Sequence, residues 1–218
     1  MPDQLVNSKA RLAVELSKLK VFEAPRLDKE QYPVDSEVAA DALWNAHYKE
    51  DIQDKVIADL GCGTGLLGIG CLLLGAKKIF FVDSDSHVLE TAQQNLHQFV
   101  DMGESEFIHE DVNEFCTAVD VVVQNPPFGT KTRHADRAFL LRAFQIADVI
   151  YSFHKSTSEN FIRKISEDNG FRVTDRYDYR FPLKAAHLFH RRKIHRIEVS
   201  CWRLEKVQKT LESGHCTA

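Results

Sequence analysis

Two hydrophobic periods alternate along the chain. Apolar residues three or four positions apart predict helices, whereas short continuous apolar runs predict strands buried on both faces. The predicted helices cover an N-terminal segment from Leu12 to Leu19 and then the ranges 36–48, 66–74, 86–99, 139–147 and 158–167. The predicted strands cover 56–58, 78–82, 105–109, 119–123, 149–153, 171–180 and 194–204.

Local sequence signals set several of these boundaries. Pro33 follows Gln31 and Tyr32 and separates the first two helices, and Gly75 is placed as the C-cap of the third. Ser86 is predicted to cap the fourth helix at its N-terminus.

Strands that alternate with helices predict an α/β fold with a mostly parallel, doubly wound sheet of seven strands and helices on both faces. We divide the chain into a helical extension at residues 1–50, a main domain at 51–204 and a flexible tail at 205–218. In such sheets ligands bind at the carboxyl ends of the strands, so the chemically distinctive residues are expected there.

Composition narrows the classes of protein to consider. Hydrophobic residues make up 44% and charged residues 28% of 218 residues, with a net charge of −4, which fits one globular domain and excludes a wholly basic nucleic-acid coat. Five cysteines without a C-x-x-C pair indicate free thiols and no metal site built by this chain. The N-terminus lacks the apolar core of a signal peptide, so we expect an intracellular protein in the nucleus or the cytoplasm, with no membrane partner.

A glycine-rich loop follows the first strand and is the first candidate site. Gly61, Gly63 and Gly65 allow a ligand to approach the backbone closely, and Asp59 before them favours a cationic amino-acid group over a pyrophosphate. Asp83 lies 22 positions after Gly61 at the end of the second strand, where an acid can hold ribose hydroxyls. Asp111 follows the third strand and is placed to reach an adenine edge. The alternative is a structural turn with solvent-facing acids.

The segment Asn125-Pro126-Pro127-Phe128 directly follows a predicted buried strand and is the candidate reaction motif. Proline fixes its own φ and holds the preceding residue extended, so the Asn125 amide and the Pro126 carbonyl become rigid neutral acceptors. These acceptors can hold an NH2 group and favour the positive charge that develops when its nitrogen attacks a methyl group. Phe128 offers a face on which a base can stack. A rigid turn with a packed Phe is the alternative.

Basic residues cluster near this motif. Residues 180–196 contain six Lys or Arg, three His and no acid, and Lys131 and Arg133 follow the motif. A basic rim beside the pocket fits RNA phosphates. A solvated basic face, or basic residues that protect a strand edge, is the alternative. The residues predicted to bind RNA are Lys131, Arg133, Arg191, Arg192 and Lys193.

Several short segments together resemble one known family. They are EQYP, DLGCGTG, VDSD, EDV, NPPFGTK, YSFHKS and FHRRK, spread over about residues 8–204. They resemble the methyltransferase-like family that converts one adenine of small-subunit (18S) ribosomal RNA to N6-methyladenosine. The resemblance implies a Rossmann-like class I methyltransferase, S-adenosylmethionine as cofactor, and a heterodimer with a small zinc-binding activator protein that adds to the sheet edge.

The resemblance also implies roles for single residues. Asn125 to Phe128 would hold the target adenine. Val34 and Thr64 depart from the family, which has Thr at the first position and Cys at the second, so a hydroxyl contact to the cofactor is lost or replaced by backbone at Val34. The residues predicted to bind the cofactor are Gln31, Val34, Asp59, Gly61, Gly63, Thr64, Leu66, Asp83, Asp111 and Val112.

Two other functions are considered. A protein glutamine N5-methyltransferase also holds an amide nitrogen with an Asn-Pro-Pro motif, but its fourth residue is usually Tyr, and Phe128 and the basic segments argue against it. A catalytically silent RNA-binding subunit could retain the fold, but the intact Asp83 and Asn125–Phe128 argue against a loss of activity.

Overall fold

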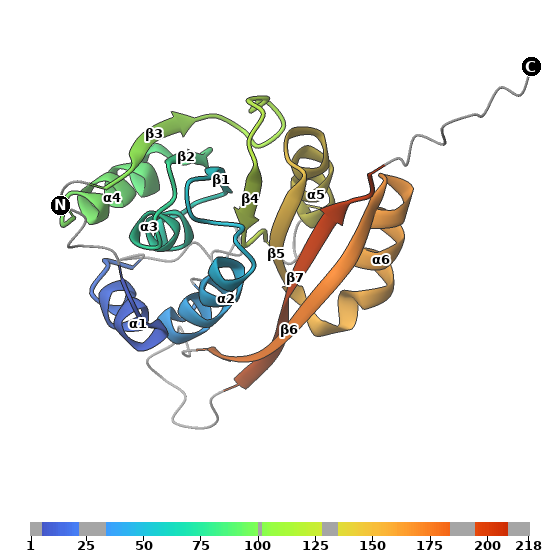
Figure 1. Ribbon diagram of the computed structural model, residues 1–218, viewed down its shortest axis with the longest axis horizontal. Coiled ribbons are helices and arrows are strands. Elements are labelled where there is room, and N and C mark those ends of the chain that lie inside the picture. Colours follow the sequence, from blue (N-terminus) through green and yellow to red (C-terminus); the bar gives the residue numbers. More distant parts are fainter. Residues whose placement is uncertain (1–5, 22–33, 100–101, 128–134, 184–194, 209–218) are drawn as a thin grey trace, which may run out of the picture.

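The computed structural model describes residues 6–21, 34–99, 102–127, 135–183 and 195–208. Six α-helices lie in these segments (Figure 1), together with the short 3-10 helix η2 at Ser156–Ser158. The α-helices are α1 (Lys9–Ser17), α2 (Ser36–Tyr48), α3 (Leu66–Leu73), α4 (Ser86–Leu96), α5 (Ala135–Ile146) and α6 (Glu159–Asp168).

Seven strands form one sheet in the order β3-β2-β1-β4-β5-β7-β6, in which only β7 runs antiparallel to its neighbours. Parallel strands joined by helices require right-handed crossovers, and the order turns at β1 and β4, where doubly wound sheets bind ligands. The strands are β1 (Val56–Leu60), β2 (Lys78–Asp83), β3 (Glu104–His109), β4 (Val121–Gln124), β5 (Val149–Lys155), β6 (Phe171–Leu183) and β7 (His195–Lys206). This architecture confirms the predicted Rossmann-like class I fold.

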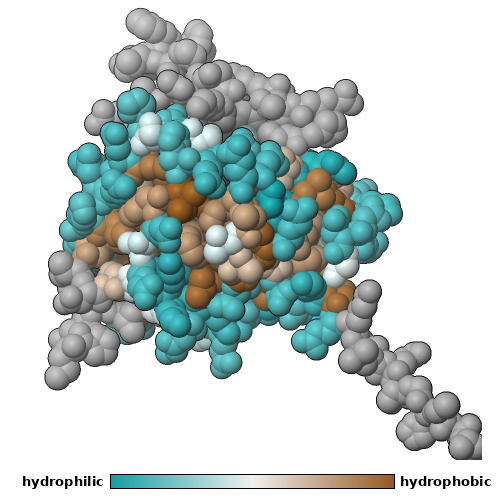
Figure 2. Space-filling model, turned by 90° about the horizontal axis from the view of Figure 1, so that it is seen from above, coloured by the Kyte–Doolittle hydropathy of each residue, from teal (hydrophilic) through white to brown (hydrophobic). Residues whose placement is uncertain are grey.

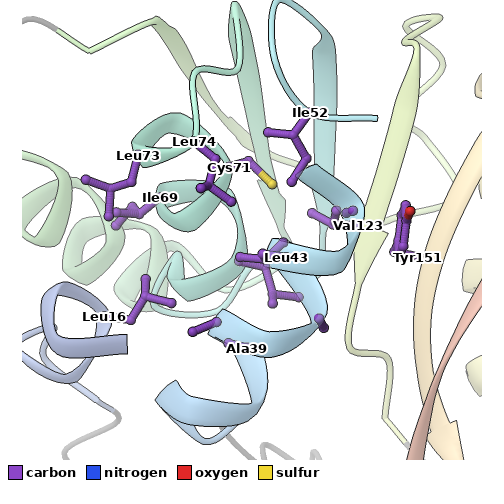
Figure 3. Packing of buried hydrophobic residues seen from close by; sticks show 14 of the residues in the cluster. Leu16, Ala39, Leu43, Ile52, Ile69, Cys71, Leu73, Leu74, Val123 and Tyr151 are labelled. Atoms are coloured by element: carbon purple, nitrogen blue, oxygen red, sulfur yellow. The ribbon is translucent and has the colours of Figure 1, made fainter. Parts of the chain in front are cut away.

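Helices cover both faces of the sheet because its central strands are apolar on both sides. One hydrophobic cluster joins α1, α2, α3 and α4 to one face, and Leu16, Leu43, Ile69 and Val123 meet within it (Figure 3). A second cluster joins α5 and α6 to the other face around the fully buried Trp202. From above, hydrophobic residues occupy the middle of the visible face and hydrophilic residues surround them (Figure 2).

A buried ion pair fixes the start of the main domain to strands near its end. The Arg203 guanidinium on β7 donates from Nε to Asp51 Oδ2 at 2.8 Å, and the Tyr151 hydroxyl on β5 donates to the same oxygen at 2.6 Å. Asp51 and Arg203 are each 8% exposed, so removing either partner would leave a buried charge uncompensated.

The structure corrects some predicted boundaries. Asp85, rather than Ser86, is the N-cap of α4, because its carboxylate accepts from the backbone N–H of His87 while Ser86 is already helical. Strand β7 continues to Lys206, so Glu205 and Lys206 belong to the sheet and not to the predicted tail. Gly75 has φ 90° just after α3, which is the backbone geometry expected near a helix C-cap. In the described part of the chain, every helix is too short or too polar to cross a membrane.

Candidate active site at the carboxyl ends of the central strands

Strand register brings the glycine loop, the ribose-binding candidate and the reaction motif side by side. Leu60 at the end of β1 pairs with Val82 on one side and Gln124 on the other. The next residue on each strand is Gly61, Asp83 and Asn125, respectively. Since neighbouring strands lie about 4.8 Å apart, these three residues form one row across the carboxyl end of the sheet.

The glycine loop has a backbone that side chains would obstruct. Gly61, Gly63 and Gly65 have φ of 66°, 53° and 85°, in the left-handed region that glycine adopts at little cost. A Cβ atom at Gly61 would lie 2.7 Å from Cε1 of Phe139 on α5. The loop therefore needs glycine at Gly61 both for its φ and for the close approach of α5.

Carboxylates hold the glycine loop in place. Asp83 accepts the backbone N–H of Gly63 at Oδ2 (2.9 Å) and that of Asp85 at Oδ1 (3.0 Å). Asp59 is 1% exposed and accepts the N–H of Gly68, in the first turn of α3, at 2.8 Å. Asp59 thus lies behind the loop, and its described hydrogen bond is made to the protein.

Burial governs the titration of Asp59. Desolvation raises the pKa of this carboxyl to about 7, the nearby Asp83 charge raises it further, and the Gly68 hydrogen bond opposes both. A cationic group bound next to the loop would favour the ionised form of Asp59. This property fits the cationic amino-acid ligand that the sequence predicts.

The loop after β3 supplies the predicted adenine-edge residues. Asp111 is exposed, and its Oδ1 accepts the backbone N–H of Asn113 at 2.9 Å and the side-chain amide at 2.8 Å. Val112 is 8% exposed and packs in the α5–α6 cluster. Arg142 on α5 donates to the Asn113 carbonyl, so the helix that follows the reaction motif also fixes this loop.

The reaction motif begins where β4 ends. Asn125 and Pro127 are half-buried and Pro126 is buried, as expected for a rigid segment at the edge of the core. Phe128 lies outside the described residues, so its predicted stacking role stays a prediction.

A chain of uncharged side chains lies beneath the motif. Gln124 donates from Nε2 to the Ser152 hydroxyl at 2.9 Å, and the same hydroxyl lies 2.6 Å from Nε2 of His154. All three residues are at most 1% exposed. Burial lowers the pKa of His154 to about 3, so its imidazole is neutral at physiological pH and accepts the Ser152 proton.

The remaining predicted cofactor residues have varied positions. Leu66 is the first residue of α3, and Thr64 is buried in the glycine loop. Val34 is 7% exposed and belongs to the α1–α4 hydrophobic cluster, which gives its apolar side chain a packing role. Gln31 and all five predicted RNA-binding residues, Lys131, Arg133, Arg191, Arg192 and Lys193, lie outside the described residues.

Sequence reasoning missed two features of the site. Asn95 on α4 donates to the Thr64 carbonyl at 2.9 Å, and the Gln124–Ser152–His154 chain underlies the motif. Asn95 could have been found as an amide among apolar residues on one helix face. Among the described residues no cluster of three or more His, Cys, Asp or Glu side chains could hold a metal ion.

Comparisons with known proteins match most of the chain. Residues 34–147 match the family described as methyltransferase small domain. The rRNA N(6)-adenosine-methyltransferase METTL5 of Danio rerio is 33% identical over 191 residues, covering 84% of this chain and 92% of that protein. An uncharacterised protein of Methanocaldococcus jannaschii is 38% identical over 209 residues, covering 91% of this chain and 94% of that protein.

A solved structure extends the match to three dimensions. The crystal structure of a proposed RNA methyltransferase from Pyrococcus horikoshii is 42% identical in sequence with a TM-score of 0.85. The match covers 93% of this chain and 100% of that chain. The glycine loop and the reaction motif therefore lie on a fold shared along almost the whole length of both proteins.

Proposed function

The chain belongs to the methyltransferase small domain family, and we propose that it methylates N6 of one adenine in the small-subunit (18S) ribosomal RNA. Its methyl donor is S-adenosylmethionine, which supplies an activated methyl group when bound. The single observation that carries the proposal is the row of Gly61, Asp83 and Asn125 at the ends of three paired strands.

The residues on the β1–β2 side fit this methyl donor. The glycine loop leaves room for a ligand close to the backbone, and Asp83 is positioned at the end of β2 for ribose hydroxyls. Asp59, buried behind the loop, favours a bound cation through its charge rather than by contact. Asp111 and Val112 would border the adenine, as the resemblance implies.

The residues on the β4–β5 side fit a neutral amine. The Asn125 amide oxygen and the Pro126 carbonyl accept the two N–H groups of an adenine amine and orient its nitrogen toward the methyl group. Both acceptors also favour the positive charge that develops on that nitrogen. No base is needed beforehand, because the amine is neutral at the start and can release its proton after transfer.

Relatives and charge distribution support an RNA substrate. The relative from Danio rerio is named as an enzyme acting on adenosine in rRNA. Most Lys and Arg side chains in the described segments pair with acids, as in Lys49–Asp175 and Arg172–Glu205, and are therefore less available to phosphates. We accordingly assign RNA phosphate contacts to Lys131, Arg133, Arg191, Arg192 and Lys193, and base stacking to Phe128.

We further propose the small zinc-binding activator as a partner in an intracellular heterodimer. Strand β3 is an edge of the sheet, so one row of its backbone groups is open to an added strand. Its Glu104, Ser105 and Glu106 side chains are exposed, so β3 is not the apolar edge that the family pattern suggests. Backbone pairing at β3 and the apolar middle of the face in Figure 2 are the features that support a partner.

One labelling experiment separates the proposed function from its alternatives. The purified chain is incubated with methyl-labelled S-adenosylmethionine and, in parallel, with ribosomal RNA or with release-factor protein. We expect label in the RNA. Label in protein alone would make the chain a glutamine methyltransferase. Calorimetry that shows no cofactor binding, with the activator present, would instead favour a silent RNA-binding subunit.

A further inference from the structure

Asn95 is a polar residue on the apolar face of α4. Val88, Leu89 and Ala92 are buried on that face, and Asn95 has 0% of its surface exposed. A buried carboxamide is costly unless its hydrogen-bonding groups find partners. The bonds that Asn95 makes therefore explain why an amide occupies this position.

The Asn95 carboxamide joins two segments that are far apart in the sequence. Its Oδ1 accepts the backbone N–H of Lys20 at 2.8 Å, and its Nδ2 donates to the Lys20 carbonyl at 3.0 Å. The same Nδ2 donates to the Thr64 carbonyl at 2.9 Å. One side chain thus binds both backbone groups of Lys20, as an adjacent strand would, and also binds the cofactor loop.

Lys20 is the point where the N-terminal segment meets the nucleotide-binding core. Leu12, Leu16 and Leu19 of this segment are buried against α2 and α3, and the Val6 N–H donates to the Leu73 carbonyl at 3.0 Å. Lys20 also donates from Nζ to Gln94 Oε1 on α4. The N-terminal segment is therefore packed along its described length and bonded at its end.

Thr64 is the central residue of the glycine loop. It lies between two glycines of positive φ, so its carbonyl direction depends on bonds made from outside the loop. Asp83 anchors the N–H of the preceding Gly63, and Asn95 anchors the Thr64 carbonyl. The first anchor belongs to the nucleotide-binding strands, whereas the second is shared with the N-terminal segment.

We propose that Asn95 is a positioning residue that couples docking of the N-terminal segment to the cofactor-binding shape of the glycine loop. The coupling does not depend on which substrate is methylated. Because coupling between two sites is reciprocal, S-adenosylmethionine stabilises the docked N-terminal segment to the same extent that docking strengthens cofactor binding. Loss of the Asn95 bonds weakens the cofactor and uncouples the segment.

Two variants of the full chain test the coupling. Asn95→Asp keeps the shape and one acceptor but sets a carboxylate against two carbonyls, and Asn95→Leu removes all three bonds at similar volume. In both we expect the S-adenosylmethionine dissociation constant, measured by calorimetry, to rise about tenfold. The KM for the cofactor should rise in parallel, while kcat at saturating cofactor stays within about twofold of wild type.

The matched control is Asn169→Leu. Asn169 also donates a side-chain amide bond, to the Ile165 carbonyl at 2.7 Å, but at the end of α6 on the other face of the sheet. We expect this variant to bind the cofactor as wild type does. A loss of affinity equal to that of Asn95→Leu would indicate general destabilisation and overturn the proposal.

Hydrogen–deuterium exchange of the wild-type chain tests the reciprocal effect without any variant. S-adenosylmethionine should slow exchange at residues 6–20, and this protection should disappear in Asn95→Leu. Equal exchange of the wild-type segment with and without cofactor would overturn the proposal. Dissociation constants within about twofold of wild type for both Asn95 variants would also overturn it.

Discussion

The two halves of the candidate site are built from different chemistry. On the β1–β2 side, Asp59 and Asp83 hold the glycine loop with carboxylates. On the β4–β5 side, the groups beneath Asn125 are an amide, a hydroxyl and a neutral imidazole. Burial moves the two titratable groups in opposite directions, raising the pKa of Asp59 to about 7 and lowering that of His154 to about 3.

This difference matches the charge that each half handles. A bound sulfonium and amino group are cations, and carboxylates nearby favour them. The amine on the other side is neutral before transfer and becomes positive only in the transition state, so fixed neutral acceptors favour the transition state over the ground state. A protonated His154 beneath the motif would oppose that charge, and its burial keeps it neutral.

The largest expected effect is on the reaction side. Asn125→Ala should lower the methylation rate at least about 100-fold, because a fixed acceptor at the amine is lost. Thermal midpoint and cofactor affinity should stay close to wild type, which keeps the effect on the β4–β5 side. An unchanged rate would mean that the amine is held by other residues.

On the cofactor side, Asp83→Ala should raise the S-adenosylmethionine dissociation constant about 10- to 100-fold, since the bonds to the loop are lost together with the ribose contact. Asp120→Ala is the matched control. Asp120 also accepts a backbone N–H, that of Val56 at 2.8 Å, but at the opposite end of the sheet. Equal loss of affinity in the two variants would contradict the role given to Asp83.

The two buried titratable groups should give opposite pH dependences of stability. The pKa of Asp59 is raised, so its contribution to the free energy of unfolding is complete below about pH 4 and is lost as pH rises through about 7. The pKa of His154 is lowered, so its contribution is complete above about pH 6.5 and is lost as pH falls toward 3.

Thermal melts between pH 4 and 8 can separate the two contributions. Asp59→Asn should lose less stability than wild type between pH 5 and 8, and His154→Gln should lose less between pH 6.5 and 4. If each variant follows the wild-type curve across its own range, the opposite titrations are refuted.

The smallest effect is expected for Ser152→Ala, which removes the link between Gln124 and His154. We expect kcat to fall about three- to tenfold through loss of a positioning bond, with cofactor affinity unchanged. Stopped-time assays at saturating cofactor measure the change. A larger effect on cofactor affinity than on kcat would remove the distinction between the two sides.

Local sequence signals predicted the fold and the main site well. The second helix was predicted at 36–48, and α2 occupies Ser36–Tyr48, because its apolar periodicity and preceding proline are local. The glycine loop and the Asn-Pro-Pro segment were also recognisable, since each carries its geometry in adjacent residues. Asp85 replaced Ser86 as the N-cap because either residue type can cap, and only the backbone shows which one is extended.

Contacts between distant segments could not be predicted in this way. Asn95 binds Lys20, 75 positions earlier, and Asp51 binds Arg203, 152 positions later. Gln124 reaches Ser152 because of the register between β4 and β5, which the pattern of a single strand does not specify. Val34 was interpreted as a lost cofactor contact, and its place in the hydrophobic cluster emerges only from packing.

The most direct test of the account is nucleoside mass spectrometry of ribosomal RNA after reaction with the purified chain and S-adenosylmethionine. The account predicts new N6-methyladenosine at one adenine of the small-subunit RNA, and none with Asn125→Ala. Ribosomal RNA without new N6-methyladenosine, from a preparation that binds the cofactor and is tested with its activator present, would contradict it.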